Sequence, residues 1–389
     1  MVTQPHTSMR YSEDVFREAM IVFGDKAHET LQLMTNPVHT YYVRCNTLKA
    51  SPELLASRLM TKGLEISRLA PIPEAIGISV KGPFQIIPTQ SRVTIDKKTT
   101  ESVLQGANVY APGILNCASM QFGDFVTVVS EIGETVAVGK AQMTASDVLT
   151  FKKGLAVSVT QRRFHSPQIR ELDEYSKGLL YPQSIAAMVT VRVLDPQPGE
   201  TIVDMNCAPG GKLSHICQLM QNHGRIIGFD RNSPKLHQTR NTMRRLGCTN
   251  VVLTIHDSRY LTEDFPDLKP DRVLIDPPCS ALGLRPKAYD YTRRERIEHL
   301  AEYQRQFVKA ASQIVRHKGT VVYSVCTFTL EECEKVVEFA VEECDLSLVK
   351  QNLRLGGPGI DIFPNSRLCQ RFHPAKHEIG YFIAKFVRD

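Results

Sequence analysis

Two cysteines, Cys279 and Cys326, each follow a run of residues that is typical of a buried strand. The runs are Asp271–Ile275, which leads into Asp276 and two prolines, and Thr320–Val325. The carboxyl ends of neighbouring parallel strands meet at one edge of a sheet, so both thiols are expected to open onto the same crevice. A thiolate that adds to carbon 6 of a cytosine turns the ring into an enamine, and carbon 5 can then take a methyl group.

After such a methylation, the proton on carbon 5 must leave and the attacking sulfur must be expelled. A second thiol can assist this release, and the residues alone leave open which cysteine attacks. Asp276 could hydrogen-bond ring nitrogen 3 and the amino group, where charge develops. A cysteine near a strand end is usually a small buried hydrophobe, and this interpretation is preferred for seven others. They are Cys45, Cys117, Cys217, Cys248, Cys333, Cys344 and Cys369.

Three acidic residues stand where earlier strands should end: Asp204, Asp230 and Asp257. Asp204 leads into residues 206–212, whose two glycines let a ligand approach the backbone at the start of a helix. Asp230 can accept both hydroxyls of a ribose, and Asp257 can accept from an adenine amino group. A Walker A loop and the G-x-G-x-x-G pattern of NAD-binding proteins are both absent from this segment. S-adenosylmethionine remains as the nucleoside ligand that fits this pattern of acids.

These residues need a scaffold of alternating strands and helices, which the chain from about residue 167 onward indicates. Such alternation implies parallel crossovers and a doubly wound, Rossmann-like α/β sheet. The predicted strands are Thr201–Asp204, Arg225–Asp230, Val251–Ile255, Asp271–Ile275 and Thr320–Val325. The predicted helices are Leu213–Met220, Ser233–Leu246, Ile297–Arg316 and Leu330–Glu343.

Two further regions precede the catalytic part, which is assigned to residues 164–389. Residues 1–91 are predicted to form a small α+β region, in which Ser12 caps one helix and Ser51–Met60 forms a second. Residues 92–163 are predicted to form a small inserted β-barrel. This barrel includes a hairpin made of Phe125–Val129 and Thr135–Val138.

Together these motifs resemble the Nop/Sun family of RNA cytosine-5 methyltransferases. The inserted barrel resembles a PUA domain, which is an RNA-binding barrel. That layout is similar to one branch of the family and implies a tRNA partner, with an acceptor-stem cytosine beside the CCA end, at position 72, as the target. Beyond the acids and cysteines above, the resemblance rests on Arg44–Lys49, Gly106–Ile114, Gly123–Val126, Val136–Gly139, Tyr181–Ser184 and Gln370–Lys385.

The resemblance also implies roles for individual residues. Cys326 is then the nucleophile and Cys279 assists release, with Asp276 beside them. The family's usual Cys-Ala-Ala-Pro-Gly-Gly-Lys-Thr begins with Asn206 here and ends with Leu213, and its usual Thr-Cys-Ser is Val-Cys326-Thr. Neither departure removes a group that the chemistry requires. The residues that would hold S-adenosylmethionine are Asn206, Cys207, Ala208, Pro209, Gly210, Gly211, Lys212, Asp230, Lys235, Asp257 and Asp276.

Basic side chains give weaker signals, each with a structural alternative. The stretch from Arg285 through Lys287 to Arg296 would either hold phosphates or form a solvated helix face. A clamp on RNA is a less favoured interpretation of four residues that close the barrel region. They are Lys152, Lys153, Arg162 and Arg163.

Aromatic and histidine side chains are ambiguous in the same way. Tyr110 and Phe122 could stack on bases, but packing in the barrel core is the preferred interpretation. His373 and His377 have helical spacing, yet Pro374 interrupts it and no carboxylate motif accompanies them. A structural role is therefore preferred for both, and no metal is expected.

The composition excludes several classes of protein. The 389 residues carry a formal net charge of +6, which permits nucleic acid as a partner without requiring it. No apolar run is long enough for a membrane helix, and Met1–Arg10 does not resemble a secretory signal. Ten cysteines without a C-x-x-C pair argue against a zinc site and indicate a reducing cytoplasm. We therefore expect a cytoplasmic monomer with neither a metal nor a membrane partner.

Three other functions stay open at this point. The chain could be an RNA-binding scaffold with an inactive methyltransferase domain, although the intact acids and both thiols argue against this. It could modify ribosomal RNA instead of tRNA. Methylation of an exocyclic amine is disfavoured, because Cys279 stands where that class of enzyme has an aromatic residue after its Asp/Asn-Pro-Pro turn.

Overall fold

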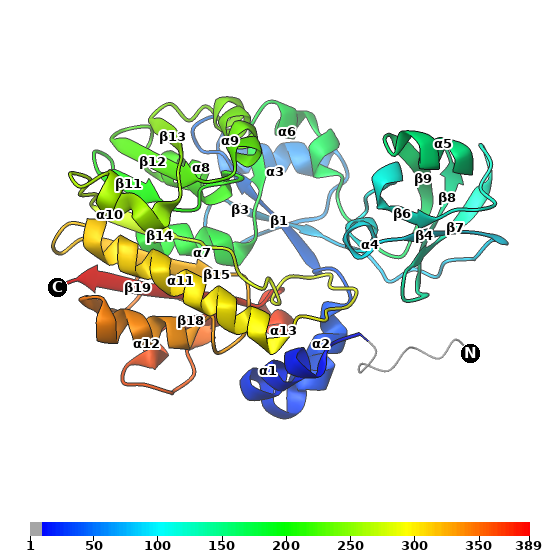
Figure 1. Ribbon diagram of the computed structural model, residues 1–389. Helices are drawn as coiled ribbons and strands as arrows, with labels where there is room; N and C mark the ends of the chain where they lie inside the picture. Colours follow the sequence, from blue (N-terminus) through cyan, green and yellow to red (C-terminus); the bar gives the residue numbers. More distant parts are fainter. Residues whose placement is uncertain (1–9) are drawn as a thin grey trace.

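The computed structural model describes residues 10–389, which form three β-sheets covered by helices (Figure 1). The sequence analysis expects no secretory signal in Met1–Arg10. Of these ten residues the structure describes only Arg10, so this expectation lies outside the described residues. Within residues 10–389, no helix is both long and apolar enough to cross a membrane.

The largest sheet carries the predicted doubly wound arrangement. Its strand order is β13-β12-β11-β14-β15-β19-β18-β17, with β16 also pairing with β19. The first five strands in this order are parallel, whereas β19 is antiparallel to β15. The parallel strands are β11 (Thr201–Asp204), β12 (Arg225–Asp230), β13 (Val251–Ile255), β14 (Arg272–Ile275) and β15 (Thr320–Val325). The others are β16 (Leu346–Leu348), β17 (Gly357–Pro358), β18 (Gln370–Phe372) and β19 (Tyr381–Arg388).

Helices cover both faces of this sheet because successive strand residues point to opposite sides. Ile202 packs with the helices of one face, whereas Val203 packs with those of the other. The first face holds α7 (Ile185–Leu194), α8 (Gly211–Leu219) and α9 (Ser233–Leu246). The second face holds α10 (Leu261–Asp264), α11 (Arg294–Ile314) and α12 (Glu334–Glu343), and α11 crosses the front of the sheet in Figure 1.

The helices match their predicted ranges except near α12. Helix α9 has the predicted bounds, and α11 begins three residues earlier than predicted. Helix α12 begins at Glu334 rather than at Leu330. The reason is local: the Thr329 side chain accepts from the backbone N–H of Glu332, and the Glu332 side chain turns away toward the Cys279 loop. Residues 330–333 therefore form a turn.

The N-terminal region contains helices and a small four-stranded sheet. Ser12 caps the first helix as predicted, because its hydroxyl accepts from the backbone of Val15. The helices are α1 (Glu13–Phe23), α2 (Ala27–Met34) and α3 (Pro52–Thr61). The sheet has the order β10-β1-β3-β2. Its strands are β1 (Thr40–Cys45), β2 (Ile66–Arg68), β3 (Ala75–Ser79) and β10 (Leu180–Pro182), so one strand comes from beyond the inserted barrel.

The inserted barrel has its own sheet and its own apolar core. The strand order is β5-β9-β8-β7-β4-β6, and the predicted hairpin is β7 (Phe125–Ser130) paired antiparallel with β8 (Thr135–Ala141). Helices α4 (Lys97–Leu104) and α5 (Ala145–Phe151) complete it. The remaining strands are β4 (Ser91–Ile95), β5 (Val109–Tyr110), β6 (Ile114–Asn116) and β9 (Leu155–Arg162).

Polar contacts fix the barrel against the catalytic part. Lys97 of α4 forms a 2.9 Å ion pair with Asp290, and Glu131 accepts from the hydroxyl of Tyr289. The two ends of the insert meet where Lys81 and His165 form an antiparallel bridge. The barrel is therefore attached by a narrow two-stranded stem and held at one side.

Candidate active site

A cavity of about 380 Å³ lies at the carboxyl ends of the parallel strands. This is where doubly wound sheets place their ligands, and the volume is within the usual range for a small-molecule site. Eight of the sequence-predicted site residues line it: Asn206, Ala208, Asp230, Lys235, Asp257, Asp276, Cys279 and Cys326.

The two cysteines meet in this cavity. Strands β14 and β15 are adjacent, as predicted, with Ile275 opposite Tyr323. The Sγ atoms of Cys279 and Cys326 are 3.4 Å apart. The contact from the Cys279 thiol, together with the nearby Lys212 ammonium, lowers the pKa of Cys326 in spite of burial. The pKa of Cys279 is raised well above its usual value, because of its contact with Cys326 and its burial. The 3.4 Å contact alone lets either thiol be the donor, and the positive charge of Lys212 favours a thiolate on Cys326 beside a thiol on Cys279.

Asp276 is held by three side chains, which come from α8, β15 and β19. Its Oδ2 accepts from Lys212 Nζ at 2.6 Å, and its Oδ1 accepts from Ser324 at 3.2 Å and from Tyr381 at 3.5 Å. Burial opposes the charge on Lys212, but Asp276 outweighs it and the pKa of Lys212 is raised. The carboxylate is thus fixed in orientation, while part of it still faces the cavity.

The loop at residues 206–212 begins α8, as its glycines predict. Gly210 caps the helix with φ of 100°, and an added Cβ would lie 2.8 Å from Met243 Cε. The remaining predicted loop residues line an adjoining cavity of about 200 Å³ rather than the larger one: Cys207, Pro209, Gly210, Gly211 and Lys212. The Cys207 side chain is buried in the core, so only its backbone can face a ligand.

Asp204 is fully enclosed beneath this loop. Its Oδ1 accepts from the backbone of Asn206 at 3.2 Å. Burial, reinforced by the nearby Asp276 carboxylate, raises the pKa of Asp204 to about 7. This strand-end acid therefore faces the loop from below and does not line the larger cavity.

The other two strand-end acids do line the cavity. Asp230 Oδ1 accepts from the backbone of Asn232 at 2.8 Å, which orients its carboxylate. Asp257 is paired with Arg259 through both oxygens, at 3.0 and 2.7 Å, and this pairing lowers the pKa of Asp257. An adenine amino group at Asp257 would therefore share the carboxylate with Arg259.

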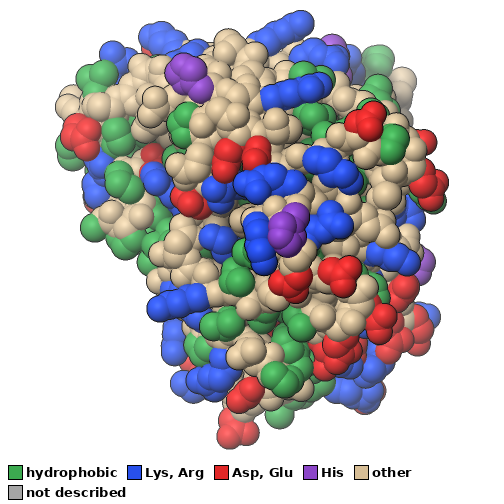
Figure 2. Space-filling view, turned by 90° about the vertical axis from the view of Figure 1, so that its left-hand side faces the viewer, with side chains coloured by type: hydrophobic (Ala, Val, Ile, Leu, Met, Phe, Trp, Pro, Cys, Tyr) green, Lys and Arg blue, Asp and Glu red, His purple; other side chains and the backbone are tan. Residues whose placement is uncertain are grey.

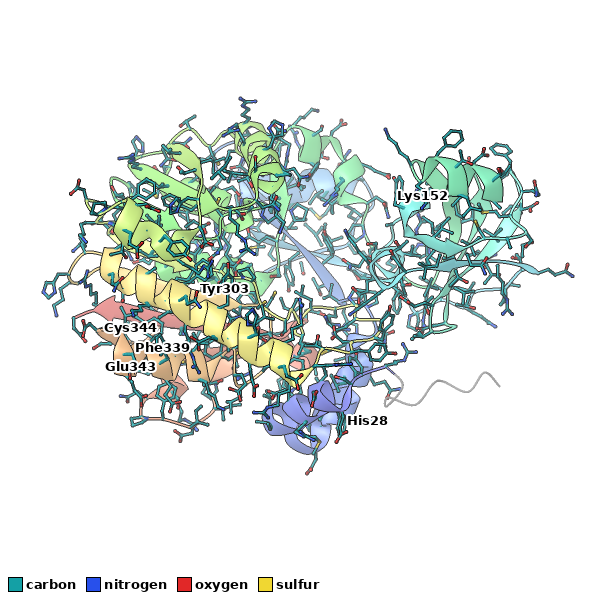
Figure 3. All side chains as sticks on the ribbon, viewed as in Figure 1. His28, Lys152, Tyr303, Phe339, Glu343 and Cys344 are labelled. Carbon is teal, nitrogen blue, oxygen red and sulfur yellow. The ribbon has the colours of Figure 1, made fainter. Side chains whose placement is uncertain are left out.

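Several lining residues have no counterpart in the predicted site. Tyr303 and Phe307 lie on one face of α11, and Figure 3 shows Tyr303 projecting from that helix. The Arg259 guanidinium lies 4.6 Å from the centre of the Tyr303 ring. An aromatic pair four residues apart is ordinary in a buried helix, so nothing in the sequence distinguishes this pair from core residues.

The expectation for phosphate contacts at Arg285 and Lys287 is wrong. Arg285 is buried and donates to the carbonyls of Asn36 and Pro37, and the buried Lys287 forms a 3.2 Å ion pair with Asp290. These side chains hold the Cys279 loop to the N-terminal region. They are not a solvated face, because their partners are all within the protein.

The barrel residues also differ from expectation. Tyr110 and Phe122 are 54% and 69% exposed, so core packing is the wrong interpretation for both. Arg162 donates to backbone carbonyls, and Arg163 pairs with Glu134 at 2.5 Å, so neither is free to clamp RNA. Lys152, which ends α5, is exposed on the barrel (Figure 3).

The two histidines have the structural contacts expected of them. The Nδ1 atom of His377 accepts from the backbone N–H of His373, and that of His373 accepts from Ala375. Within residues 10–389, no group of three or more potential metal ligands is clustered.

Charges of both signs lie on one face of the catalytic part. Figure 2 shows the end of the catalytic part that faces away from the barrel, where basic and acidic side chains are interspersed. The net charge of +6 therefore does not gather on that face.

Comparison with known proteins agrees with this geometry. A family model described as 16S rRNA methyltransferase RsmB/F matches residues 191–387, and a PUA domain model matches residues 91–162. The tRNA (cytosine(72)-C(5))-methyltransferase of Pyrococcus horikoshii is 40% identical to this chain, and the match covers 95% of each of the two chains. Human tRNA (cytosine(72)-C(5))-methyltransferase NSUN6 is 29% identical over 94% of this chain and 92% of its own.

A solved structure supports the same assignment over nearly the whole chain. The crystal structure of NSun6 from Pyrococcus horikoshii with SFG has a TM-score of 0.90 and 38% identity, and it covers 98% of this chain and 99% of its own. The fold and the inserted barrel thus have counterparts in one group of proteins. The chain belongs to the RsmB/F family of S-adenosylmethionine-dependent methyltransferases and contains a PUA domain.

Proposed function

We propose that this enzyme methylates carbon 5 of a tRNA cytosine in the acceptor stem, at position 72 beside the CCA end. The observation that carries the proposal is the pair of thiols 3.4 Å apart in the strand-end cavity, next to the fixed Asp276. The names of the Pyrococcus and human relatives supply the substrate and the position. S-adenosylmethionine supplies the methyl group when it is bound.

The residues of the cavity fit a nucleoside donor. Asp230 is oriented to accept from ribose hydroxyls, and Asp257 with Arg259 forms one wall beside Tyr303. Asn206 Oδ1 is buried in this structure without a hydrogen-bond partner, so it is available as an acceptor. The related crystal structure from Pyrococcus horikoshii contains SFG, which is an analogue of S-adenosylmethionine. This relative supports the same class of ligand here. Lys235 lies at the cavity edge as a further contact.

In the first step, the Cys326 thiolate adds to carbon 6 of the cytosine and forms a C–S bond. The electron pair of the 5,6 double bond shifts toward carbon 5 and the neighbouring edge formed by carbon 4 and nitrogen 3, which makes carbon 5 nucleophilic. Asp276, held by Lys212 and Ser324, is placed to hydrogen-bond the ring edge where this charge collects. Carbon 5 would then form a bond to the methyl carbon of the bound donor, while the bond from that carbon to the donor's sulfonium sulfur would break and leave its electron pair on the sulfur.

In the second step, the enzyme is released from the RNA. The proton on carbon 5 passes to water, its electron pair restores the 5,6 double bond, and the C–S bond breaks with its pair returning to Cys326. The Cys279 thiol lies within contact of this departing sulfur and stabilises it by donating a hydrogen bond. Cys326 ends as a thiolate, so one proton is released for each methyl group transferred.

Separate alanine variants of the two cysteines test the assignment. Cys326→Ala should form neither 5-methylcytosine nor a covalent RNA adduct. Cys279→Ala should accumulate an adduct that survives denaturing electrophoresis, because addition proceeds while release is slow. Cys344→Ala, which removes a buried thiol from the end of α12, should behave as the wild type does. Normal methylation by Cys326→Ala would show that the nucleophile is assigned to the wrong residue.

The substrate is tested with the same proteins. A tRNA transcript whose cytosine 72 is replaced by uridine should take no methyl group, and bisulfite sequencing of the unaltered tRNA should show one protected cytosine at position 72. Methylation of ribosomal RNA but not of tRNA would favour the alternative target. Binding of RNA without any methyl transfer would favour an inactive scaffold.

The PUA domain and the free thiols support the remaining parts of the proposal. The exposed Tyr110 and Lys152 of the barrel offer a ring and a cation to single-stranded RNA such as the CCA end. All ten cysteines are unpaired in the structure, which suits the reducing cytoplasm as the place of action. We propose that the enzyme acts there as a monomer.

A further inference from the structure

A carboxylate that the reaction above does not use lies directly behind the two thiols. Glu332 is completely buried in the turn between β15 and α12. Its carboxylate accepts four hydrogen bonds, and every donor is neutral. Oε1 accepts from the Ser280 backbone at 2.8 Å and from Gln304 at 3.0 Å, and Oε2 accepts from the hydroxyls of Ser280 at 2.5 Å and Thr329 at 3.0 Å.

The donors connect the two cysteine loops to each other. Ser280 directly follows Cys279, and Thr327 directly follows Cys326. The hydroxyls of Ser280 and Thr327 are 2.8 Å apart. Each thiol is therefore followed by a hydroxyl, and the two hydroxyls are in contact. The Glu332 carboxylate accepts from both the hydroxyl and the backbone N–H of Ser280. We refer to Glu332, Ser280 and Thr327 as the loop clasp.

Neighbouring residues fix the clasp from the core side. Gln304 of α11 donates both to Glu332 and to the carbonyl of Pro278, one residue before Cys279. The hydroxyl of Tyr323 donates to Gln304 at 2.8 Å and also contacts the Glu332 carbonyl at 2.7 Å. The Cys279 loop is thus held on both sides of its thiol, by Gln304 before it and by Glu332 after it.

A buried carboxylate without a cation is costly, because its charge loses hydration that neutral donors replace only in part. An apolar residue would make a cheaper core at this position. The position of this carboxylate matters for the chemistry. The contact with Cys326 and burial raise the pKa of Cys279, and the nearby Glu332 adds to this rise, which favours the protonated thiol.

We infer that Glu332 is a positioning residue for release, which through Ser280 and Thr327 holds the Cys279 thiol against the sulfur that leaves the cytosine. This inference rests on the proposed function, since it assigns the clasp to the second step of that reaction. In that step the C–S bond breaks and its electron pair returns to Cys326, which accepts a hydrogen bond from Cys279. A Cys279 loop that drifts leaves this sulfur without its donor, so the adduct persists.

Two variants test the clasp, and a third serves as a matched control. Ser280→Ala removes one hydroxyl and leaves the backbone donor in place. Glu332→Gln keeps the size of the side chain and removes the charge. Glu331→Gln removes the neighbouring carboxylate, which contacts neither cysteine loop and instead pairs with Lys335 at 2.7 Å and Arg294 at 3.5 Å. Each full-length protein is incubated with tRNA and S-adenosylmethionine, and the adduct fraction, kcat and both KM values are measured.

We expect Ser280→Ala and Glu332→Gln to lower kcat about tenfold, while the fraction of enzyme bound covalently to RNA rises. The reason is that displacing the Cys279 thiol slows the release step and leaves the addition step unchanged. Both KM values should stay within about twofold of wild type, and Glu331→Gln should match the wild type. A general loss of folding would instead lower the adduct and the product together. That parallel loss in Ser280→Ala, or a wild-type adduct fraction in both variants, would overturn the inference.

The wild type and Cys279→Ala run in the same assay separate this inference from the proposed function. If neither forms 5-methylcytosine or an adduct, the proposed function fails. If Cys279→Ala accumulates the adduct while Ser280→Ala and Glu332→Gln do not, only the role of the clasp fails.

Discussion

The side chains of the proposed site stand at the carboxyl ends of parallel strands, where position along the strand determines which edge of the sheet a side chain reaches. Asp230, Asp257, Asp276 and the two cysteines proposed to react all line one cavity there. The partners of Asp276 could not be predicted in this way. Tyr381 begins the antiparallel strand β19, more than a hundred residues from Asp276, and no local pattern connects them.

The charge of Lys212 acts on Cys326, the proposed nucleophile, and gives a prediction about pH. The Lys212 ammonium lowers the pKa of Cys326, so Lys212→Met should raise it and move the acidic limb of the pH–rate profile to higher pH. Single-turnover methylation should fall most at low pH and recover in part as the pH rises. Lys269→Met, which removes a surface cation that donates to Gln313, is the control. A uniform loss of rate at every pH would contradict the electrostatic explanation.

The buried acid Asp204 gives a prediction about stability. Its pKa is raised to about 7 in the folded protein from an ordinary value of 3.8, so the folded state binds its proton more tightly than the unfolded state. This contribution to stability is present at low pH and is lost as the pH rises through 7, on the order of 4 kcal/mol. Asp204→Asn keeps an acceptor for the Asn206 backbone and removes the charge.

The asparagine variant should therefore gain stability over wild type between pH 4 and pH 8, as measured by urea unfolding at a series of pH values. Asp267→Asn, at an exposed position, should show no such gain. If the difference between Asp204→Asn and wild type is the same at pH 4 and pH 8, Asp204 is not the group whose proton is retained on folding.

At the scale of elements, the alternation of strands and helices predicts the parallel strands of the large sheet. It does not predict the short strands that pair with distant parts of the chain. Strands β11 to β15 have apolar runs that end in acids or cysteines, so their bounds and adjacency follow from pattern. Strand β10 has only three residues, and it pairs with β1 from a distant part of the chain. Its pairing depends on tertiary contacts, as a short strand generally does.

A buried ionic cluster joins the N-terminal sheet to the catalytic helices. Glu74, just before β3, accepts from Arg192 of α7 at 2.9 and 2.6 Å and from His215 of α8 at 2.8 Å. Burial and the nearby Arg44 lower the pKa of His215 to about 4, so His215 is neutral and donates its Nε2 proton. Within this cluster Glu74 and His215 are buried, whereas the Arg192 side chain is 33% exposed.

Glu74→Gln should therefore lower the free energy of unfolding by about 1 to 3 kcal/mol, because the buried Glu74 carboxylate accepts hydrogen bonds from both Arg192 and His215. Chemical denaturation measures the loss. The matched control is Glu65→Gln, whose ion pair with Lys81 is exposed and should change stability by less than about 0.5 kcal/mol. Equal effects of the two variants would show that the cluster is not what joins the two regions.

At the scale of the whole molecule, composition is a poor guide to the proposed RNA-binding surface. Charge is spread over the chain, and several of the barrel residues that are exposed to solvent are aromatic. Phe122, Phe125 and Phe151 are all more than half exposed on the barrel, and the exposed Lys152 and Lys153 directly follow Phe151. Sequence alone favours a core for such rings, since burial is their usual environment. Which rings face outward depends on how β5 to β9 close around the separate core of the barrel.

The position of the barrel leads to a prediction for the complete enzyme. The insert leaves and re-enters at the bridge between Lys81 and His165, so residues 84–163 can be replaced by a short Gly-Ser turn without separating the flanking strands. The donor cavity is lined only by residues 205 to 326, and no barrel residue contributes to it. The shortened protein should therefore bind S-adenosylmethionine with unchanged affinity in a calorimeter. Its affinity for tRNA should fall at least about tenfold, because the exposed rings and cations that would stack on single-stranded RNA are gone. An unaltered tRNA affinity would show that the barrel is not the RNA-binding part, and a parallel loss of donor affinity would show that it supports the fold instead.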